Sequence, residues 1–469
     1  MSTDLMDLGL ADPEAIVRYD RLNSGLDQLA SAAGRLGPLQ QYWRGDQPAA
    51  FLSKESQEAL DNRLKALAVN FPRLAVLALS ERLRLSGIVD TRAGRPLAEQ
   101  PASVWDALID AGLADTAGVI ITDRLFYGSS YATVWATEAG RLTLTADGPA
   151  TMTHAADPAT GDTDYAVRAW STSKHGAKAV LYEADQITRY SQPASSEPIP
   201  GSGWRIVDTL DNPLGVVPVV PFVRRASATD QPTGDSLIAD ILDLTDAVAK
   251  LLGDAMVTSE FHSKPRRWAT GLEIQEEPDA EGVMQPVDPF AKKRLMQSEA
   301  PETKFGQLEA SRLDGYSDMI ATMTQQIGSL TGLPATYLGL HGDQPASAEA
   351  TKAAEVQLTM RAYTEQASMT RGWQDVAWLT AAVMAGAPAN PDDRRRYTIA
   401  WASPEVRTQA QAADAAAKLH GIGVPLGPLL VDPLGYSPED AAAITAAART
   451  DAIIGGLGRL PAAPNNRQP

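Results

Sequence analysis

Apolar residues recur at helical spacing through the first third of the chain. The positions lie three or four residues apart, at Leu64, Leu67, Phe71, Leu74 and Leu77. Because proline lacks a backbone N–H, Pro72 predicts the start of a new helix. A second helical pattern runs from about 104 to 127 and ends at Gly128, a residue suited to a left-handed cap.

The period then changes from that of a helix to that of a strand. Short runs rich in β-branched and aromatic residues, separated by glycine, aspartate and proline, lie at 131–135, 141–145, 165–170 and 179–182. This pattern predicts an antiparallel meander with a loop tip at 157–161, closing near 216–222.

Helical periodicity returns in the second half of the chain. It predicts long helices at about 236–261, 312–330 and 347–385, with Gly332 after the second, Ser347 capping the third and a bend at Gly372. Two shorter helices follow, one ending at Gly421 and one beginning at 437–440, before a tail at 461–469 that we expect to be disordered. Residues 262–306 show little periodicity and predict a compact insertion between the first two long helices.

Composition narrows the class of protein. The length of 469 residues suits about three domains. With 41 basic and 58 acidic residues the net charge is −17, which argues against a broad nucleic-acid-binding surface. The absence of cysteine excludes disulfides and thiolate chemistry. The acidic start has no signal-peptide core and no long apolar run predicts a membrane span, so we expect a cytosolic or virion protein.

The short motifs of catalysis and metal binding do not occur in the sequence. There is no GxxxxGK[ST], no HExxH and no GxSxG. The histidines are scattered without metal-pair spacing, at His154, His175, His262, His341 and His420. The Asp392-Asp393 pair adjoins three arginines and predicts a neutralised turn rather than a cation site. We therefore expect no enzyme activity, metal or cofactor.

Two charge patterns are candidate functional surfaces. Along the predicted helix 236–261 four charged residues recur at helical steps and so share a face, namely Asp240, Asp243, Lys250 and Asp254. Residues 262–306 hold seven basic and eight acidic side chains, with basic runs formed by Lys264, Arg266 and Arg267 and by Lys292, Lys293 and Arg294. Each run is either a solvated face or a docking patch for an acidic partner.

Four stretches, in this order and spacing, resemble the portal proteins of tailed bacteriophages, of the siphophage type found in phages of actinobacteria. They are Tyr42–Pro48 with Phe51-Leu52, Asn70–Arg84, Phe126–Trp135, and Gly332–Gly339 followed by Pro345–Ala350. The resemblance implies an α+β portal architecture. Its parts are an α/β wing at 1–234, a two-helix stem at 235–261 and 307–337, a small mixed clip at 262–306, a tunnel loop at 338–347, a long wing helix at 348–404 and an α-helical crown at 405–460.

The same resemblance implies a function and a set of partners. Portal proteins form a dodecameric ring at one capsid vertex, through which double-stranded DNA passes without sequence specificity during packaging and ejection. The implied partners are the terminase large subunit, scaffolding and major capsid proteins and the head-completion adaptor, with no membrane. The implied location is the virion, after assembly in the host cytoplasm.

Site residues follow from the resemblance as well. The tunnel loop implies DNA-facing positions at Leu340, His341, Gly342, Asp343 and Gln344. Asp240, Asp243 and Asp254 would line the channel, or else lie on a solvated or subunit-facing side of their helix. The basic runs of the clip would dock the motor and the adaptor. An acidic channel suits the passage of DNA. Each phosphate that a lysine or arginine neutralises would strengthen DNA binding and so hinder its movement.

Two other interpretations stay open at this point. One is a different head–tail connector or capsid-associated structural protein, although the stem–clip–stem order argues against it. The other is an intracellular enzyme whose site is built from distant residues that no short motif reveals.

Overall fold

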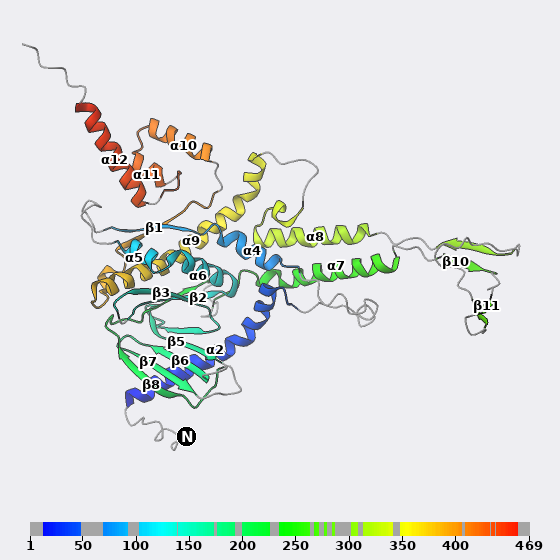
Figure 1. Cartoon of the computed structure of the whole chain (residues 1–469), viewed down its shortest axis with the longest axis horizontal. Coiled ribbons are helices and arrows are strands. Elements are labelled where there is room, and N and C mark those ends of the chain that lie inside the picture. The colour runs from blue at the N-terminus through cyan, green and yellow to red at the C-terminus, as the bar shows by residue number, and fades with distance from the viewer. Residues whose placement is uncertain are drawn as a thin grey trace, which may run out of the picture. The chain divides into compact units, whose positions relative to one another are not determined.

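The chain folds into helices and antiparallel sheets that form two compact units (Figure 1). The computed structural model describes residues 13–47, 69–91, 103–137, 139–172, 176–192, 199–225, 234–262, 267–271, 276–278, 284–286, 302–307, 313–340, 348–405, 409–431, 433–436 and 438–457. The first unit contains Met1–Gly45, Asn70–Leu242 and Gly328–Pro469, and the second contains Asp46–Val69 and Asp243–Ile327. The predicted α+β class is confirmed.

A five-stranded antiparallel sheet in the first unit contains two of the predicted strands, 165–170 in β5 and 179–182 in β6. Its strands follow chain order, as β4 (Met152–Ala156), β5 (Thr163–Thr172), β6 (Gly176–Tyr182), β7 (Gln186–Gln192) and β8 (Arg205–Asp211). Helix α2 (Pro13–Arg44) buries Leu22, Leu26 and Leu29 against it. A Cβ at Gly25 would lie 2.5 Å from the Val167 side chain, so this glycine lets the helix approach the sheet closely.

The remaining strands of the predicted meander form a separate sheet. Its order is β3 (Leu142–Asp147), β2 (Ser129–Ala136) and β9 (Val219–Val223), all antiparallel. Helices α6 (Leu113–Tyr127) and α9 (Ala348–Ala385) pack against this sheet. A Cβ at Gly372 would lie 2.5 Å from the Phe222 ring, so this glycine serves close packing of α9 on β9. The bend predicted at Gly372 stays a prediction.

Several elements of the first unit differ from the sequence pattern. The prediction of a single helix at 104–127 was wrong. Gly112 adopts a left-handed φ of 86° and separates α5 (Val104–Asp110) from α6. Strands β1 (Leu85–Asp90) and β14 (Tyr397–Trp401) pair across the chain and were not predicted. Helix α4 (Phe71–Ser80) has Pro72 in its first turn, as expected.

The end of the chain is helical, as the sequence predicts. Helices α10 (Gln409–Gly421) and α12 (Pro438–Leu457) end and begin at the expected residues, and a short unpredicted helix, α11 (Leu426–Val431), lies between them. Ser437 and the tail at 461–469 lie outside the described residues.

The second unit is built on two antiparallel helices. Helix α7 (Leu242–His262) follows a short 3-10 turn, η2 (Ala239–Ile241), and therefore begins later than predicted. Near its end Thr258 Oγ1 lies 3.3 Å from Tyr316 Oη, at the start of α8 (Asp314–Thr331). Between the helices, β10 (Arg267–Thr270) pairs with β13 (Lys304–Gln307), and β11 (Glu276–Pro278) pairs with β12 (Met284–Pro286).

In the first unit, two chain segments cross at a pair of glycines just before α7. Gly128 and Gly234 have φ of 93° and 75°. A Cβ at Gly234 would lie 2.2 Å from Gly128 O, and a Cβ at Gly128 would lie 2.7 Å from the Gly234 carbonyl carbon. The Leu237 amide donates to Leu125 O over 2.9 Å. The segment that leads into α7 is therefore held against the end of α6, and only glycine fits at the crossing.

We expect Gly234→Ala to lower the free energy of unfolding by about 2 kcal/mol or more, because it adds both backbone strain and a clash. Urea unfolding of the full chain measures the change. The matched control is Gly118→Ala on the exposed side of α6, where an added Cβ meets nothing within 4 Å. That substitution should stabilise the chain by less than about 1 kcal/mol. Equal effects at the two positions would contradict the close crossing.

Candidate functional site

A buried ion network joins three elements of the first unit. Glu365 of α9 accepts hydrogen bonds from Arg124 of α6 and, over 3.0 Å, from Nε of Arg224, which directly follows β9. Arg124 also donates to Ser368 Oγ over 2.8 Å. Arg124 is 2% exposed and Glu365 is 8% exposed. Charges this deep must be paired, since removal of one partner leaves an uncompensated buried ion.

The pKa shifts of this network follow from burial and from the neighbouring charges. Burial alone would raise the pKa of Glu365, but Arg124 and Arg224 together hold it below its usual range. Burial lowers the pKa of Arg124, and Glu365 opposes this shift. Arg361, also on α9, has its pKa lowered by burial and by Arg224. Glu365 is therefore ionised and bound by two guanidinium groups, and its charge also acts on Arg361.

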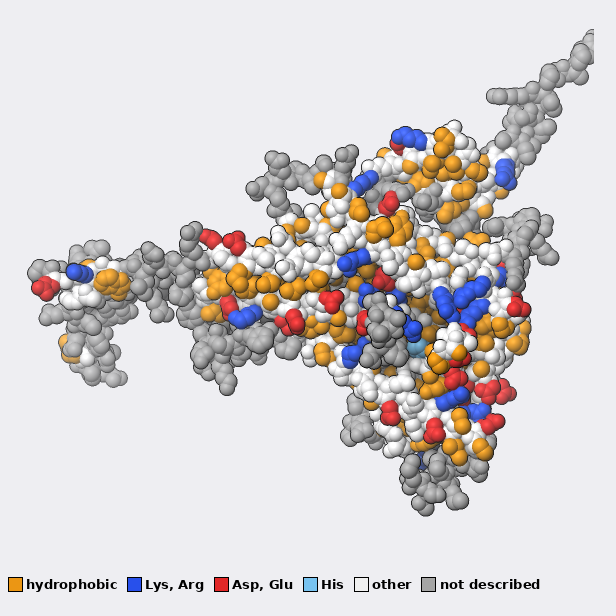
Figure 2. All heavy atoms as spheres, turned by 180° about the vertical axis from the view of Figure 1, so that it is seen from behind, with side chains coloured by type: hydrophobic (Ala, Val, Ile, Leu, Met, Phe, Trp, Pro, Cys, Tyr) orange, Lys and Arg blue, Asp and Glu red, His pale blue; other side chains and the backbone are white. Residues whose placement is uncertain are grey.

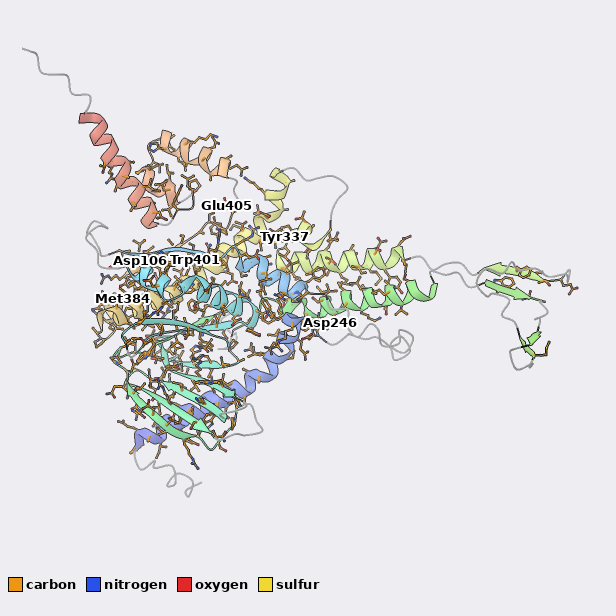
Figure 3. The ribbon with its side chains drawn as sticks, viewed as in Figure 1. Asp106, Asp246, Tyr337, Met384, Trp401 and Glu405 are labelled. Carbon is orange, nitrogen blue, oxygen red and sulfur yellow. The ribbon has the colours of Figure 1, made fainter. Side chains whose placement is uncertain are left out.

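The segment that follows α8 is fixed by a second polar cluster in the first unit. Gly332 has a φ of 73° and ends the helix, as predicted. Tyr337, labelled in Figure 3, lies in the short turn η3 (Ala335–Leu338). Its Oη accepts a hydrogen bond from Arg82 over 3.2 Å and donates to Glu355 of α9 over 3.4 Å. Arg82 also donates to Pro404 O over 3.0 Å. The cluster joins η3, α9 and the segment before α10.

The predicted tunnel loop begins directly after this cluster. Leu340 is described, and its amide donates to Ala335 O over 3.0 Å. His341, Gly342, Asp343 and Gln344 lie outside the described residues. Their role as DNA-facing residues stays a prediction.

The three carboxylates expected to line the channel, Asp240, Asp243 and Asp254, lie in η2 and α7 and are called the acidic strip here. Asp240 belongs to η2 and not to the long helix in which the sequence placed it, and Asp243 opens α7. Both are exposed. Asp254 forms an ion pair with Lys250 one turn away, so part of the strip is neutralised within the helix. Whether these residues line a channel stays a prediction.

In the predicted clip, the structure describes the short strands but few of the basic residues. Arg267 is the first residue of β10. Lys264, Arg266, Lys292, Lys293 and Arg294 lie outside the described residues. Opposite β10, a Cβ at Gly306 would lie 2.4 Å from the Trp268 ring, so the tryptophan packs directly over this glycine.

Apolar side chains are exposed on the helix pair of the second unit. Met256 of α7 is 42% exposed, Met319 of α8 is 50% exposed and Leu313, just before α8, is 37% exposed. Hydrophobic side chains are visible along this helix pair in Figure 2. Contiguous exposed apolar surface on a protein is typical of an interaction site.

Two of the described histidines, His154 and His420, lie within hydrogen-bond distance of other groups of the protein. His154 Nδ1 lies 3.3 Å from Tyr131 Oη, and burial together with Arg225 lowers its pKa to about 4. His420 Nδ1 lies 3.1 Å from Val424 O. Over the described residues, no group of three or more His, Asp or Glu side chains is placed to hold a metal ion, and no helix is long and apolar enough to cross a membrane.

The ion network was not predicted from the sequence. One signal was present, because Asp123 and Arg124 lie between the apolar pairs Ile120-Ile121 and Leu125-Phe126. A charged side chain that is buried in the fold requires a partner of opposite sign. The partner, Glu365, is 241 residues away and no local pattern identifies it.

Asp123, next to Arg124 on α6, has a half-buried side chain. Burial raises its pKa to about 6, and the carboxyl packs against Gly148 at the turn between β3 and β4. Its charge in turn raises the pKa of Tyr127, after the larger effect of burial. The folded chain therefore binds a proton at Asp123 at a pH where the unfolded chain does not.

Comparison with known proteins gives a consistent set of relatives. Residues 35–425 match the family described as "Phage portal protein, SPP1 Gp6-like". The chain is 27% identical over 442 residues to the portal protein of Mycobacterium phage L5, covering 92% of this chain and 87% of the relative. It is 29% identical over 370 residues to the portal protein of Mycobacterium phage D29, covering 76% and 73%.

Among solved structures, a chain from the neck of a native GTA particle computed with C12 symmetry matches at 14% identity and a TM-score of 0.44. The match covers 80% of this chain and 92% of that chain.

We expect Asp123→Asn to raise the free energy of unfolding at pH 7 by about 2 kcal/mol, because it removes a half-buried charge. The contribution of Asp123 to stability should fall as pH rises from about 4 to about 6, since the folded state keeps the Asp123 proton in that window, whereas His154 contributes the opposite slope in parent and variant alike. In urea unfolding at several pH values, the stability of the variant relative to the parent should therefore increase across this window. As a control, the stability of the exposed Asp115→Asn variant on the same helix should keep a constant difference from the parent. A difference between Asp123→Asn and the parent that stays constant from about pH 4 to about pH 6 would contradict the raised pKa.

Proposed function

The chain belongs to the SPP1 Gp6-like phage portal proteins, and on this premise we propose that it assembles into a closed dodecameric ring at one capsid vertex and conducts double-stranded DNA. The observation that supports this most is the family match over residues 35–425. That range contains described elements of both units, including the sheets, the helix pair α7 and α8, and the long helix α9.

In the proposed ring, the second unit supplies the stem and the clip. Helices α7 and α8 would be the stem, and the short strands between them would belong to the clip. The exposed apolar side chains Met256, Leu313 and Met319 would be covered by neighbouring copies, since obligate assemblies bury apolar surface between subunits. The α10–α12 helices would form the crown.

The charge of the chain suits the passage of DNA. Twelve copies carry 12 × −17 = −204 charges, and such an assembly repels a polyanion within a Debye length of about 8–10 Å. The exposed Asp240 and Asp243 at the start of α7 would line the channel. DNA would then slide without the deep electrostatic trap that a basic bore creates.

The proposed partners follow from this role. The terminase large subunit and, later, the head-completion adaptor would dock on the clip through its basic runs. Scaffolding and major capsid proteins would contact the ring during assembly in the host cytoplasm, before the ring becomes part of the virion.

Multi-angle light scattering of the purified full chain tests the ring. A dodecamer has a mass of 12 × 49.9, or about 599 kDa, and electron micrographs of the same sample should show annular particles. A stable 49.9 kDa monomer at micromolar concentration would contradict the proposal.

Charge reversal tests the docking role of the clip. We expect the combined Lys264→Glu, Arg266→Glu and Arg267→Glu variant to weaken binding of the terminase or the adaptor, most strongly at low salt, because opposite charges steer and hold the partners. The control reverses three other cations, in Lys178→Glu, Arg205→Glu and Arg395→Glu, all exposed in the first unit. Unchanged binding by the clip variant at low salt would contradict the docking role.

A further inference from the structure

Helix α9 contacts the chain where it leads into the 243–327 segment. Before α7, Arg224 donates from its backbone to Gly128 O over 2.8 Å and from Nη1 to Asp235 O over 3.2 Å. The Asp235 amide donates back to Arg224 O over 3.0 Å. The same guanidinium is bound by Glu365 of α9. The incoming connection, residues 234–241, is thus held to α9 through Arg224.

Helix α9 also contacts the chain where it leaves that segment. One turn before Glu365, Arg361 Nη2 donates to Leu330 O over 2.8 Å, in the last turn of α8. A cation at this position also interacts favourably with the helix C-terminus. A Cβ at Gly332 would lie 2.8 Å from Arg361 Nε, so the arginine packs directly on the helix end. The outgoing connection, residues 328–334, is thus held to α9 through Arg361.

Arg361 has a second partner within reach. Side chains four residues apart on a helix are neighbours, so Arg361 can turn from Leu330 O to the carboxylate of Glu365. That carboxylate is already shared by Arg124 and Arg224. A third guanidinium competing for it would weaken the bond to Arg224, because like charges repel and the acceptor sites are limited.

We propose that Arg361 is a positioning residue that couples the two connections. When the end of α8 is displaced, Arg361 leaves Leu330 O, turns to Glu365 and loosens Arg224, which releases residues 234–241. The proposal rests on the portal function in one respect, since DNA or a docked partner would supply the displacement of the 243–327 segment. Both connections, residues 234–241 and 328–334, therefore change together, and the displacement is transmitted to α9 through Arg361.

The test displaces Arg361 without removing it. Gly332→Ala places a methyl group where the Arg361 side chain lies. Hydrogen exchange of the full chain is then followed in peptides covering 328–334 and 234–241. We expect exchange to rise about fivefold in both peptides, the change that the loss of one hydrogen bond produces. In an Arg361→Met background the same Gly332→Ala substitution should affect 328–334 alone.

Two controls separate coupling from general loosening. Gly339→Ala introduces a residue at another left-handed position of the same region, φ 73°, where an added Cβ meets nothing, and should leave 234–241 unchanged. Arg371→Met removes another arginine of α9, 53% exposed, and should leave the response to Gly332→Ala intact in both peptides.

Two results would overturn the proposal. One is no change at 234–241 in Gly332→Ala, and the other is the same change at 234–241 with and without Arg361. Exchange is measured whatever the assembly state of the chain. Failure of the coupling is therefore distinguishable from failure of the ring, which the particle mass decides.

Discussion

The buried carboxylate of Glu365 is the electrostatic centre of the first unit. It pairs with Arg124 of α6 and with Arg224 at the end of β9, and the helix that bears it lies against the three-stranded sheet. Without this carboxylate the buried guanidinium of Arg124 would lose its counter-charge beside the half-buried Arg224, a state that costs several kcal/mol. The geometry around it therefore fixes where α6, β9 and α9 meet, and it fixes the position of the chain that enters α7.

Within the first unit, the chain is held on either side of the 243–327 segment. The Gly128–Gly234 crossing prevents the incoming chain from shifting sideways, and Arg224 anchors it to α9. The outgoing chain is held by Arg361 at the end of α8 and again by Tyr337.

Single proline and glycine residues in the sequence predicted where several helices begin and end. Pro72 at the start of α4, Gly128 at the end of α6 and Gly332 at the end of α8 lie where proline and glycine place them. The break at Gly112 was missed, because a glycine inside a helical pattern does not by itself reveal a left-handed conformation. The division of the meander into two sheets was also missed, since strand periodicity does not say which strands pair.

The functional residues were harder to predict than the fold. The β1–β14 pairing and the Arg124–Glu365 bond join positions more than 200 residues apart, and only the folded chain brings them together. The portal family was identified from short motifs whose order matters, and the match over residues 35–425 bears this out. The charge patterns at 240–254 and in the clip gave candidates, but their orientation depends on helix rotation and assembly, which a single sequence does not specify.

We propose that the assembled protein surrounds duplex DNA and does not hold it. Equilibrium binding of a short duplex to the assembled full chain, measured between 50 and 200 mM salt, tests this most directly. We expect no measurable affinity at about 150 mM salt and almost no dependence of the binding constant on salt. Tight binding with a log–log slope of several units, about −0.9 for each phosphate neutralised, would contradict it.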